Sequence, residues 1–327
     1  MFNQRFEDYK ENTENIMSEM IAPRDALGDI FIELGEQHPS LVLLDADFNT
    51  ASKVAPFAER FPERFVQVGI AEQNMMSVAA GLSTTGFLPY ASTLAAFCSR
   101  RACDQVMVSI ALSNLNVKIL GIYPGLFVGL NGASHQALED IAIMRSMANM
   151  TVFQPADAWE TREILKYSIT HTGPMYIRIG RDPVPRFMPE GYKFQIGKSV
   201  TLLEGNDVTL ICYGELVGDT LEASSLLRNK GIQARVINMS SIKPIDKEAI
   251  IKAARETGKI VTVDNHNING GVGSAVCEVV SENFPVRVKR IGVMDLFGKS
   301  GSNEAMKEKF GLRSVDIAKE TEIFLKE

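Results

Sequence analysis

The chain has 327 residues, 45% hydrophobic and 23% charged, with a formal net charge of -6. This composition is that of a soluble globular protein of about two domains, and it offers no basic stripe for nucleic acid and no apolar run of about 18 residues for a membrane span. The polar, acidic N-terminus is unlike a signal peptide. The four scattered cysteines show neither the spacing of a disulfide framework nor that of a metal site, so we expect a cytoplasmic protein.

Short apolar segments alternate with helical patterns through the first half of the chain. Continuously apolar strands between helices predict a mostly parallel sheet that is buried on both faces. In such a sheet, a ligand binds beyond the carboxyl ends of the strands. The expected strands are 41–47, 64–69, 87–92, 116–123, 150–155 and 174–179, and the expected helices are 72–82, 94–112, 135–148 and 157–170.

Prolines and glycines interrupt this pattern at 180–198, and the alternation then restarts. The predicted fold class is therefore α/β, with two domains that each contain a mostly parallel sheet flanked by helices. The strands expected in the second half are 207–214, 234–239, 259–265 and 286–293, and the helices are about 215–229, 245–256, 271–282 and 303–310. The expected divisions are an N-terminal extension at 1–20, a first domain at 21–185, a linker at 186–206 and a second domain at 207–327.

A carboxylate stands where the second expected strand turns into a helix, in the sequence FVQVGIAEQNM (65–75). Glu72 follows Gly69 by three residues and lies in the first helical turn. The positive end of the helix dipole favours an acid there, so spacing alone gives Glu72 a purely structural explanation. Four further motifs follow it, namely LPYASTLAAF (88–97), VGLNGASHQALEDIAIMRS (128–146), SIKPIDKEAI (241–250) and IVTVDNHNINGGVG (260–273).

In their order and intervals, these motifs resemble the pyrimidine-binding and C-terminal domains of transketolase, a thiamine-diphosphate enzyme. The resemblance extends from about residue 20 to the end of the chain. It implies that Glu72 hydrogen-bonds N1′ of the cofactor's aminopyrimidine and so supports the imino tautomer that deprotonates the thiazolium carbon. We expect Ile70, Met75 and an apolar pocket to surround this carboxyl group and to disfavour its charged form.

The resemblance also implies contacts with the cofactor and with the sugar. Phe97 corresponds to the aromatic residue that stacks on the pyrimidine, although alone it would suit core packing. Two neighbouring aromatic positions of the family are Leu94 and Arg100 here, and we expect the guanidinium of Arg100 to stack on the cofactor instead. Asp47 corresponds to an acid near the cofactor. His135, which alone would suit a helix cap, corresponds to a histidine that lines the substrate channel and assists proton transfer, as a second catalytic residue.

Further positions correspond to residues that bind the donor. Arg24 and Arg181 match arginines that clamp the phosphate of a sugar phosphate, with Ser52 beside them, because a planar guanidinium binds the oxygens of phosphate or sulfonate in pairs. Two positions depart from the family. Asn131 stands where an aspartate usually contacts a donor hydroxyl, and Tyr123 stands where a histidine often does. These departures predict a ketose other than the common pentose phosphates.

The sequence contains no GDG, the start of the motif that binds the Mg²⁺ of thiamine diphosphate in this superfamily. The resemblance therefore implies that a second polypeptide carries the pyrophosphate-binding domain and most of the metal site, in a heterotetramer with two copies of each chain. The implied reaction moves a two-carbon ketol unit from a ketose phosphate to an aldose phosphate through a thiamine-diphosphate ylide and an enamine. Two alternatives stay open: a beta subunit of a 2-oxo-acid dehydrogenase, and a subunit that binds but has lost catalysis.

Overall fold

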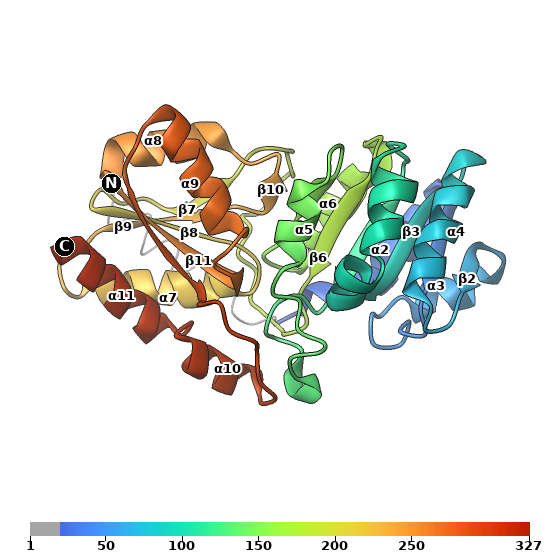
Figure 1. Ribbon diagram of the computed structural model, residues 1–327, viewed down its shortest axis with the longest axis horizontal. Coiled ribbons are helices and arrows are strands. Elements are labelled where there is room, and N and C mark those ends of the chain that lie inside the picture. Colours follow the sequence, from blue (N-terminus) through green and yellow to red (C-terminus); the bar gives the residue numbers. More distant parts are fainter. Residues whose placement is uncertain (1–19) are drawn as a thin grey trace.

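The computed structural model describes residues 20–327, so the expected extension at 1–20 falls almost entirely outside the described residues. Two α/β domains lie next to each other (Figure 1). The first sheet contains β1 (Leu41–Asp45), β2 (Phe65–Gln67), β3 (Leu88–Leu94), β4 (Lys118–Ile122), β5 (Thr151–Phe153), β6 (Met175–Ile179) and β10 (Ser241–Lys243). The second sheet contains β7 (Val200–Leu203), β8 (Val208–Cys212), β9 (Ala234–Asn238), β11 (Lys259–Asn267) and β12 (Arg287–Val293).

The strand order is β10-β5-β6-β4-β3-β1-β2 in the first sheet and β12-β11-β8-β9-β7 in the second. Every neighbouring pair is parallel except β10–β5 and β7–β9. The predicted fold class, two domains with mostly parallel sheets flanked by helices, is confirmed. The strand β7 lies within the stretch 186–206 that was expected to be a linker.

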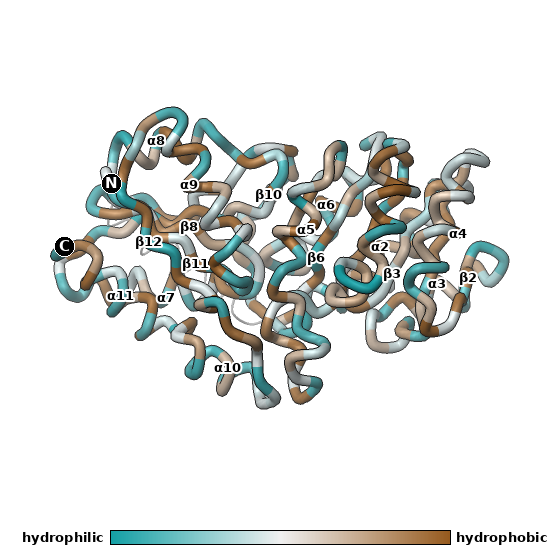
Figure 2. Tube along the Cα trace, in the orientation of Figure 1, coloured by the Kyte–Doolittle hydropathy of each residue, from teal (hydrophilic) through white to brown (hydrophobic). Residues whose placement is uncertain are grey.

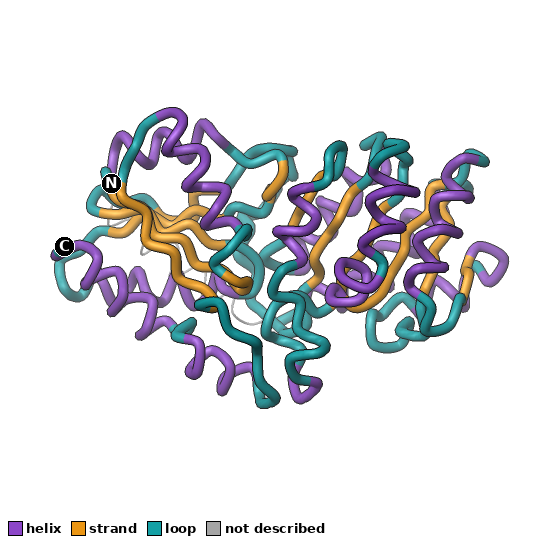
Figure 3. Tube along the Cα trace, viewed as in Figure 1, coloured by secondary structure: helices purple, strands orange, loops and turns teal. Residues whose placement is uncertain are grey.

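Helices cover both faces of each sheet (Figures 1 and 3). In Figure 1, α8 and α9 lie above the second sheet, and α7 and α11 lie below it. The first domain contains α2 (Leu27–Gln37), α3 (Ala55–Arg60), α4 (Glu72–Thr84), α5 (Asp140–Ser146), α6 (Ala158–Thr170) and the short helices η1 (Pro23–Ala26), η2 (Pro62–Arg64), η3 (Phe97–Arg101), η4 (Gln105–Ala111) and η5 (Gly129–Asn131). The second domain contains α7 (Leu216–Arg228), α8 (Lys247–Thr257), α9 (Val272–Asn283), α10 (Asn303–Phe310) and α11 (Ser314–Lys326).

The strand β1 shows why a continuous apolar run becomes the centre of such a sheet. Val42 and Leu44 pack into the core on the α4 side, whereas Leu41 and Leu43 pack into the core on the α2 side. Each fully buried aliphatic side chain contributes about 1.5–3 kcal/mol relative to exposure. In Figure 2, hydrophobic residues concentrate inside both domains, and the helical turn beside β2 is hydrophilic.

Two expected helices differ from the structure. The helix expected at 135–148 begins only at Asp140. The residues before it are held in turns by an antiparallel bridge between Gly125 and Ala137, so His135 lies ahead of the helix. The helix expected at 94–112 contains two π-helical stretches, η3 and η4, with wider turns than an α-helix.

A buried polar cluster joins the two domains. Arg178 on β6 is fully buried, and its Nε and Nη2 donate to the two carboxylate oxygens of Asp140 at 2.8 and 3.1 Å. Arg178 also donates to the side chain of Gln154 and, at 3.3 Å, to the carbonyl of Asn265 on β11. His266 lies beside the pair, with Nε2 3.9 Å from Asp140 Oδ1. The cluster therefore fixes β11 of the second domain against the start of α5 in the first.

His266 in this cluster makes stability depend on pH. Burial lowers the pKa of His266 to about 4, although the charge of Asp140 opposes the shift. An unfolded histidine has a pKa of about 6.5. The unfolded chain therefore binds more protons between these values, and a contribution to stability that is complete above about pH 6.5 is lost as the pH falls toward 4.

As the pH falls through that window, we expect His266 alone to lower the free energy of unfolding by up to about 1.4 kcal/mol per pH unit. Urea denaturation of the wild type and of His266→Asn at pH 7, 6 and 5 measures this contribution. The variant should show the shallower dependence on pH. Equal slopes for the two proteins would contradict the assignment.

Candidate functional site

Glu72 lies at the carboxyl end of β2, where the chain turns into α4. Gly69 has φ 70°, a left-handed conformation that glycine adopts without strain, and Glu72 is the first residue of the helix. Glu72 is 1% exposed, and its Oε2 lies 2.7 Å from Nη1 of Arg101. Met75 is buried as expected, whereas Ile70 is 72% exposed. The structure therefore adds a cation, Arg101, beside this buried acid, which the expected apolar surround did not include.

The ring of Phe97 lies between Arg101 and His135 and contacts both. The guanidinium carbon of Arg101 is 4.1 Å from the centroid of the Phe97 ring. The same ring meets that of His135 edge-on, with centroids 5.1 Å apart. His135 Nδ1 is 2.9 Å from the hydroxyl of Ser134. Glu72, Arg101, Phe97 and His135 thus form one connected group, with Phe97 and Arg101 both on the π-helical turn η3.

Arg100 points elsewhere. Its Nε lies 2.9 Å from Glu139 Oε1, and its Nη2 donates to the carbonyl of Ser134 at 2.8 Å. Burial raises the pKa of Glu139, and the charge of Arg100 opposes that shift. The guanidinium that lies on an aromatic ring in the structure is that of Arg101, so cofactor stacking by Arg100 stays a prediction. Arg100 instead supports the segment that carries His135.

A second group lies beyond the ends of β4 and β6. The guanidinium carbons of Arg24 and Arg181 each lie 5.1 Å from the ring centroid of Tyr123. Arg24 Nη1 donates to the Tyr123 hydroxyl, and that hydroxyl donates to the carbonyl of Ala51 at 3.0 Å. Ser52 is the next residue, but it is buried and its hydroxyl donates to the carbonyl of Asn49 at 3.3 Å. The structure thus brings the two predicted arginines together around Tyr123, with Ser52 behind them.

Asp47 and Asn131 are both exposed. Asp47 follows β1 with φ 60°, and its backbone N–H donates to the side-chain oxygen of Gln67 at 2.8 Å. Asn131 ends η5. Asp47 therefore lies at the carboxyl edge of the sheet, and Asn131 lies on the loop that leads to His135.

The second domain holds this loop. Gln136 is buried, and its Nε2 donates to the carbonyls of Leu126 and Lys299, each at 3.0 Å. The backbone N–H of Gly129 donates to Asn303 Oδ1 at 3.1 Å. In Figure 1 the loop is the green segment that carries the short helix η5, beside the dark red segment that precedes α10. Support of the site by the second domain was not predicted from the sequence.

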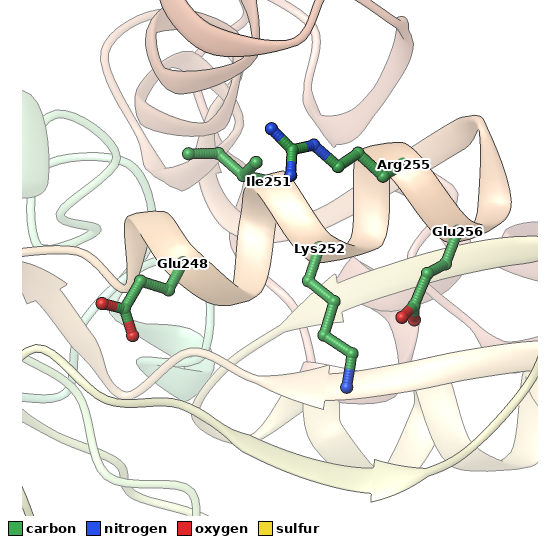
Figure 4. Close-up of a pocket in the computed structure, with 5 residues that line it drawn as sticks. All are labelled: Glu248, Ile251, Lys252, Arg255 and Glu256. Atoms are coloured by element: carbon green, nitrogen blue, oxygen red, sulfur yellow. The ribbon is translucent and has the colours of Figure 1, made fainter.

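A pocket on α8 is lined by Glu248, Ile251, Lys252, Arg255 and Glu256, with acidic and basic side chains in equal number and none of the predicted site residues (Figure 4). Among residues 20–327, no group of three or more His, Cys, Asp or Glu is arranged to hold a metal. The helices of the described part of the chain include none that is long and apolar enough to cross a membrane.

Comparisons with known proteins match each of the two domains to a known protein family. The model for the pyrimidine-binding domain of transketolase matches residues 19–186, and the model for the transketolase C-terminal domain matches residues 197–317. A 6-deoxy-6-sulfo-D-fructose transketolase subunit from Clostridium sp. (strain MSTE9) is 42% identical over 90% of this chain and 92% of its own length. An apulose-4-phosphate transketolase subunit from Phocaeicola vulgatus is 41% identical over 94% of this chain and 98% of its own length.

Other relatives are longer or have solved structures. A 1-deoxy-D-xylulose-5-phosphate synthase from Geobacter sulfurreducens is 37% identical over 91% of this chain, which spans only 47% of that protein. A solved structure described as a split gene transketolase, inactive beta4 tetramer, has 46% sequence identity and a TM-score of 0.87, covering 94% of this chain and 99% of the other. The chain therefore belongs to the transketolase family and contains its pyrimidine-binding and C-terminal domains, as the sequence motifs predicted.

Proposed function

We propose that the chain is the C-terminal subunit of a two-chain transketolase, which moves a two-carbon ketol unit from an anionic ketose to an aldose phosphate. The observation that carries the proposal is the connected group Glu72, Arg101, Phe97 and His135, at the edge of the sheet where ligands of parallel sheets bind. The relatives that are named transketolase subunits support a separate partner chain. A heterotetramer with two copies of each chain is the assembly that we propose.

The residues present fit the pyrimidine end of thiamine diphosphate. A buried carboxylate and the face of an aromatic ring both contact one planar N–H donor, the guanidinium of Arg101. An aminopyrimidine is also planar, with donors on its edge and a face that stacks. When bound, the cofactor supplies the carbanion chemistry that breaks and forms the carbon–carbon bond. We assign Mg²⁺ and the diphosphate mainly to the partner chain.

Each side chain then has a defined task. Glu72 holds a proton at N1′ of the pyrimidine, and Phe97 supports the ring. His135, in contact with Phe97, moves a proton at a donor hydroxyl. Arg24 and Arg181 bind the terminal anion of the sugar with their planar forks. The other predicted contacts stay part of the proposal: Asp47 and Arg100 near the cofactor, and Ser52, Tyr123 and Asn131 near the donor.

A reconstitution experiment tests the proposal against the two alternatives. The chain is mixed with a candidate partner that bears GDG, thiamine diphosphate and Mg²⁺, and each chain is also assayed alone. Donors are fructose 6-phosphate and 6-deoxy-6-sulfo-D-fructose, with glyceraldehyde 3-phosphate as acceptor, and pyruvate is assayed separately for decarboxylation. Ketol transfer only by the pair supports the proposal. If the pair decarboxylates pyruvate and shows no ketol transfer, the result favours the 2-oxo-acid alternative. If the two chains form a stable pair that is inactive in both assays, the result favours a binding subunit.

Donor choice gives a further expected result. Asn131 retains the shape of the usual aspartate but lacks its charge, so Asn131→Asp should move the preference between donors toward the common pentose phosphates. We expect a change of about tenfold or more in the ratio of kcat/KM values, which corresponds to about 1.4 kcal/mol. Steady-state kinetics on a panel of phosphorylated and sulfonated ketoses measures the ratio. Unchanged kcat/KM ratios between the donors would contradict this role.

The compartment that we propose is the cytoplasm. All four cysteines are free thiols, and Cys98 and Cys212 are buried. Burial raises the pKa of the Cys212 thiol to about 12, so this group is not a reactive thiolate at neutral pH. Scattered, unpaired thiols are typical of proteins in a reducing compartment.

A further inference from the structure

Arg101 makes the two contacts that the proposed function assigns to the pyrimidine ring. We propose that Arg101 is a displaceable occupant of the pyrimidine position, which holds the carboxylate of Glu72 until the cofactor binds. The inference rests on the proposed function, because that function assigns Glu72 and Phe97 to the pyrimidine. It adds a residue of this chain that competes with the cofactor for both of them.

The geometry is that of a planar cation in the place of a planar heterocycle. Nη1 of Arg101 lies 2.7 Å from Glu72 Oε2, and its guanidinium carbon lies 4.1 Å from the centroid of Phe97. A guanidinium carries N–H donors around its edge and stacks through its face. One group therefore satisfies the acid with its edge while it covers the ring with its face. A pyrimidine that uses the same acid and the same ring cannot occupy that space at the same time.

Because the carboxylate of Glu72 is buried, a cation beside it stabilises the protein when no cofactor is bound. The side chain of Glu72 is only 2% exposed, and a buried carboxylate without a partner is costly. Arg101 supplies the partner when no ligand does. Because the side chain of Arg101 is 44% exposed, it can turn into water and regain hydration when another donor takes its place. Exchange of one donor for another leaves the acid paired throughout.

Such an occupant lowers the apparent affinity of the cofactor. The apparent dissociation constant equals the intrinsic one divided by the fraction of molecules whose site is free. If Arg101 covers the site nine times in ten, its removal should tighten binding about tenfold. This direction is opposite to that expected for a residue that binds the cofactor directly.

The experiment measures binding of thiamine diphosphate to the reconstituted pair by isothermal titration calorimetry at a fixed Mg²⁺ concentration. Arg101→Met removes the charge and the planar donors, and should lower the dissociation constant about tenfold. Arg101→Lys keeps the charge without the planar fork, and should give a smaller decrease in the same direction. Arg60→Met is the matched control, because Arg60 also pairs with an acid, Glu36 at 3.3 Å, and lies 5.2 Å from the Phe61 ring centroid, away from the site. This control should leave the dissociation constant unchanged.

Weaker or unchanged binding by Arg101→Met, with the melting curve of the wild type, would overturn the inference. If Arg101→Met does not fold, the direction of the shift in Arg101→Lys decides by the same criterion. Failure of the wild-type pair to bind thiamine diphosphate would instead overturn the proposed function. The two failures are therefore distinguishable in one series of titrations.

Discussion

Replacement of Glu72 with alanine should lower kcat for ketol transfer by the reconstituted pair about a thousandfold, within the range for loss of a group that positions a proton. The acid is the only group assigned to N1′, and alanine neither holds nor shares a proton. The fold should survive, because the partner of Glu72 is the half-exposed Arg101, which water can then solvate. The measurement is steady-state turnover with saturating cofactor, alongside thermal melting of the isolated chain.

Two variants separate charge loss from the proposed role of Glu72. Glu72→Gln retains the shape and should be nearly as inactive as the alanine variant, because an amide does not give up a proton. Glu36→Gln removes an exposed acid that pairs with Arg60 at 3.3 Å, and should turn over like the wild type. Undiminished turnover in Glu72→Ala would remove the basis of the proposed function.

Arg178→Met should destabilise the protein by about 3–5 kcal/mol, the usual cost of breaking a buried ion pair by removal of one partner. The variant leaves Asp140 fully buried, with the hydroxyl of Tyr176 at 2.6 Å as its remaining strong donor. It also removes the hydrogen bond that reaches β11 of the second domain. Guanidinium denaturation at pH 7, followed by circular dichroism, gives the free energy of unfolding.

Arg145→Met provides the matched comparison for this effect. Arg145 lies on α5, the helix that begins with Asp140, and it pairs across the domain boundary with Glu278 at 2.6 Å, but that acid is exposed. An ion pair that reaches solvent is worth at most about 1 kcal/mol. Similar losses in Arg178→Met and Arg145→Met would contradict the importance assigned to the buried cluster.

The predicted strands succeed where an apolar run alone determines the structure. β1, β4 and β6 lie within the expected segments because all their residues are buried. β10 was missed because its three residues, Ser241–Lys243, form a strand only by pairing with β5, which is distant in sequence. The helices α2, α3 and α11 and the strand β7 were also not predicted. Such elements depend on the partner that covers them, which a local pattern does not reveal.

The residues of the candidate site were likewise predicted only in part. Motif order identified Glu72, Phe97 and His135, and the structure brings Arg101 and these three residues into contact. Arg101 was missed because the motif match pointed to the neighbouring Arg100. Which of two adjacent arginines meets Phe97 depends on the wide turn of η3, a feature without a clear signal in sequence. The need of a buried acid for a cation was the signal that could have identified Arg101.

The pairing of β10 with β5 also limits how the gene can be divided. A fragment that stops near residue 206 would keep six strands of the first sheet and lose the seventh, which leaves β5 with unpaired N–H and C=O groups along its outer edge. Uncovered edges of this kind recruit strands from other molecules. The isolated first half should therefore aggregate on expression, and soluble halves should require that Ser241–Lys243 be grafted back beside Thr151–Phe153.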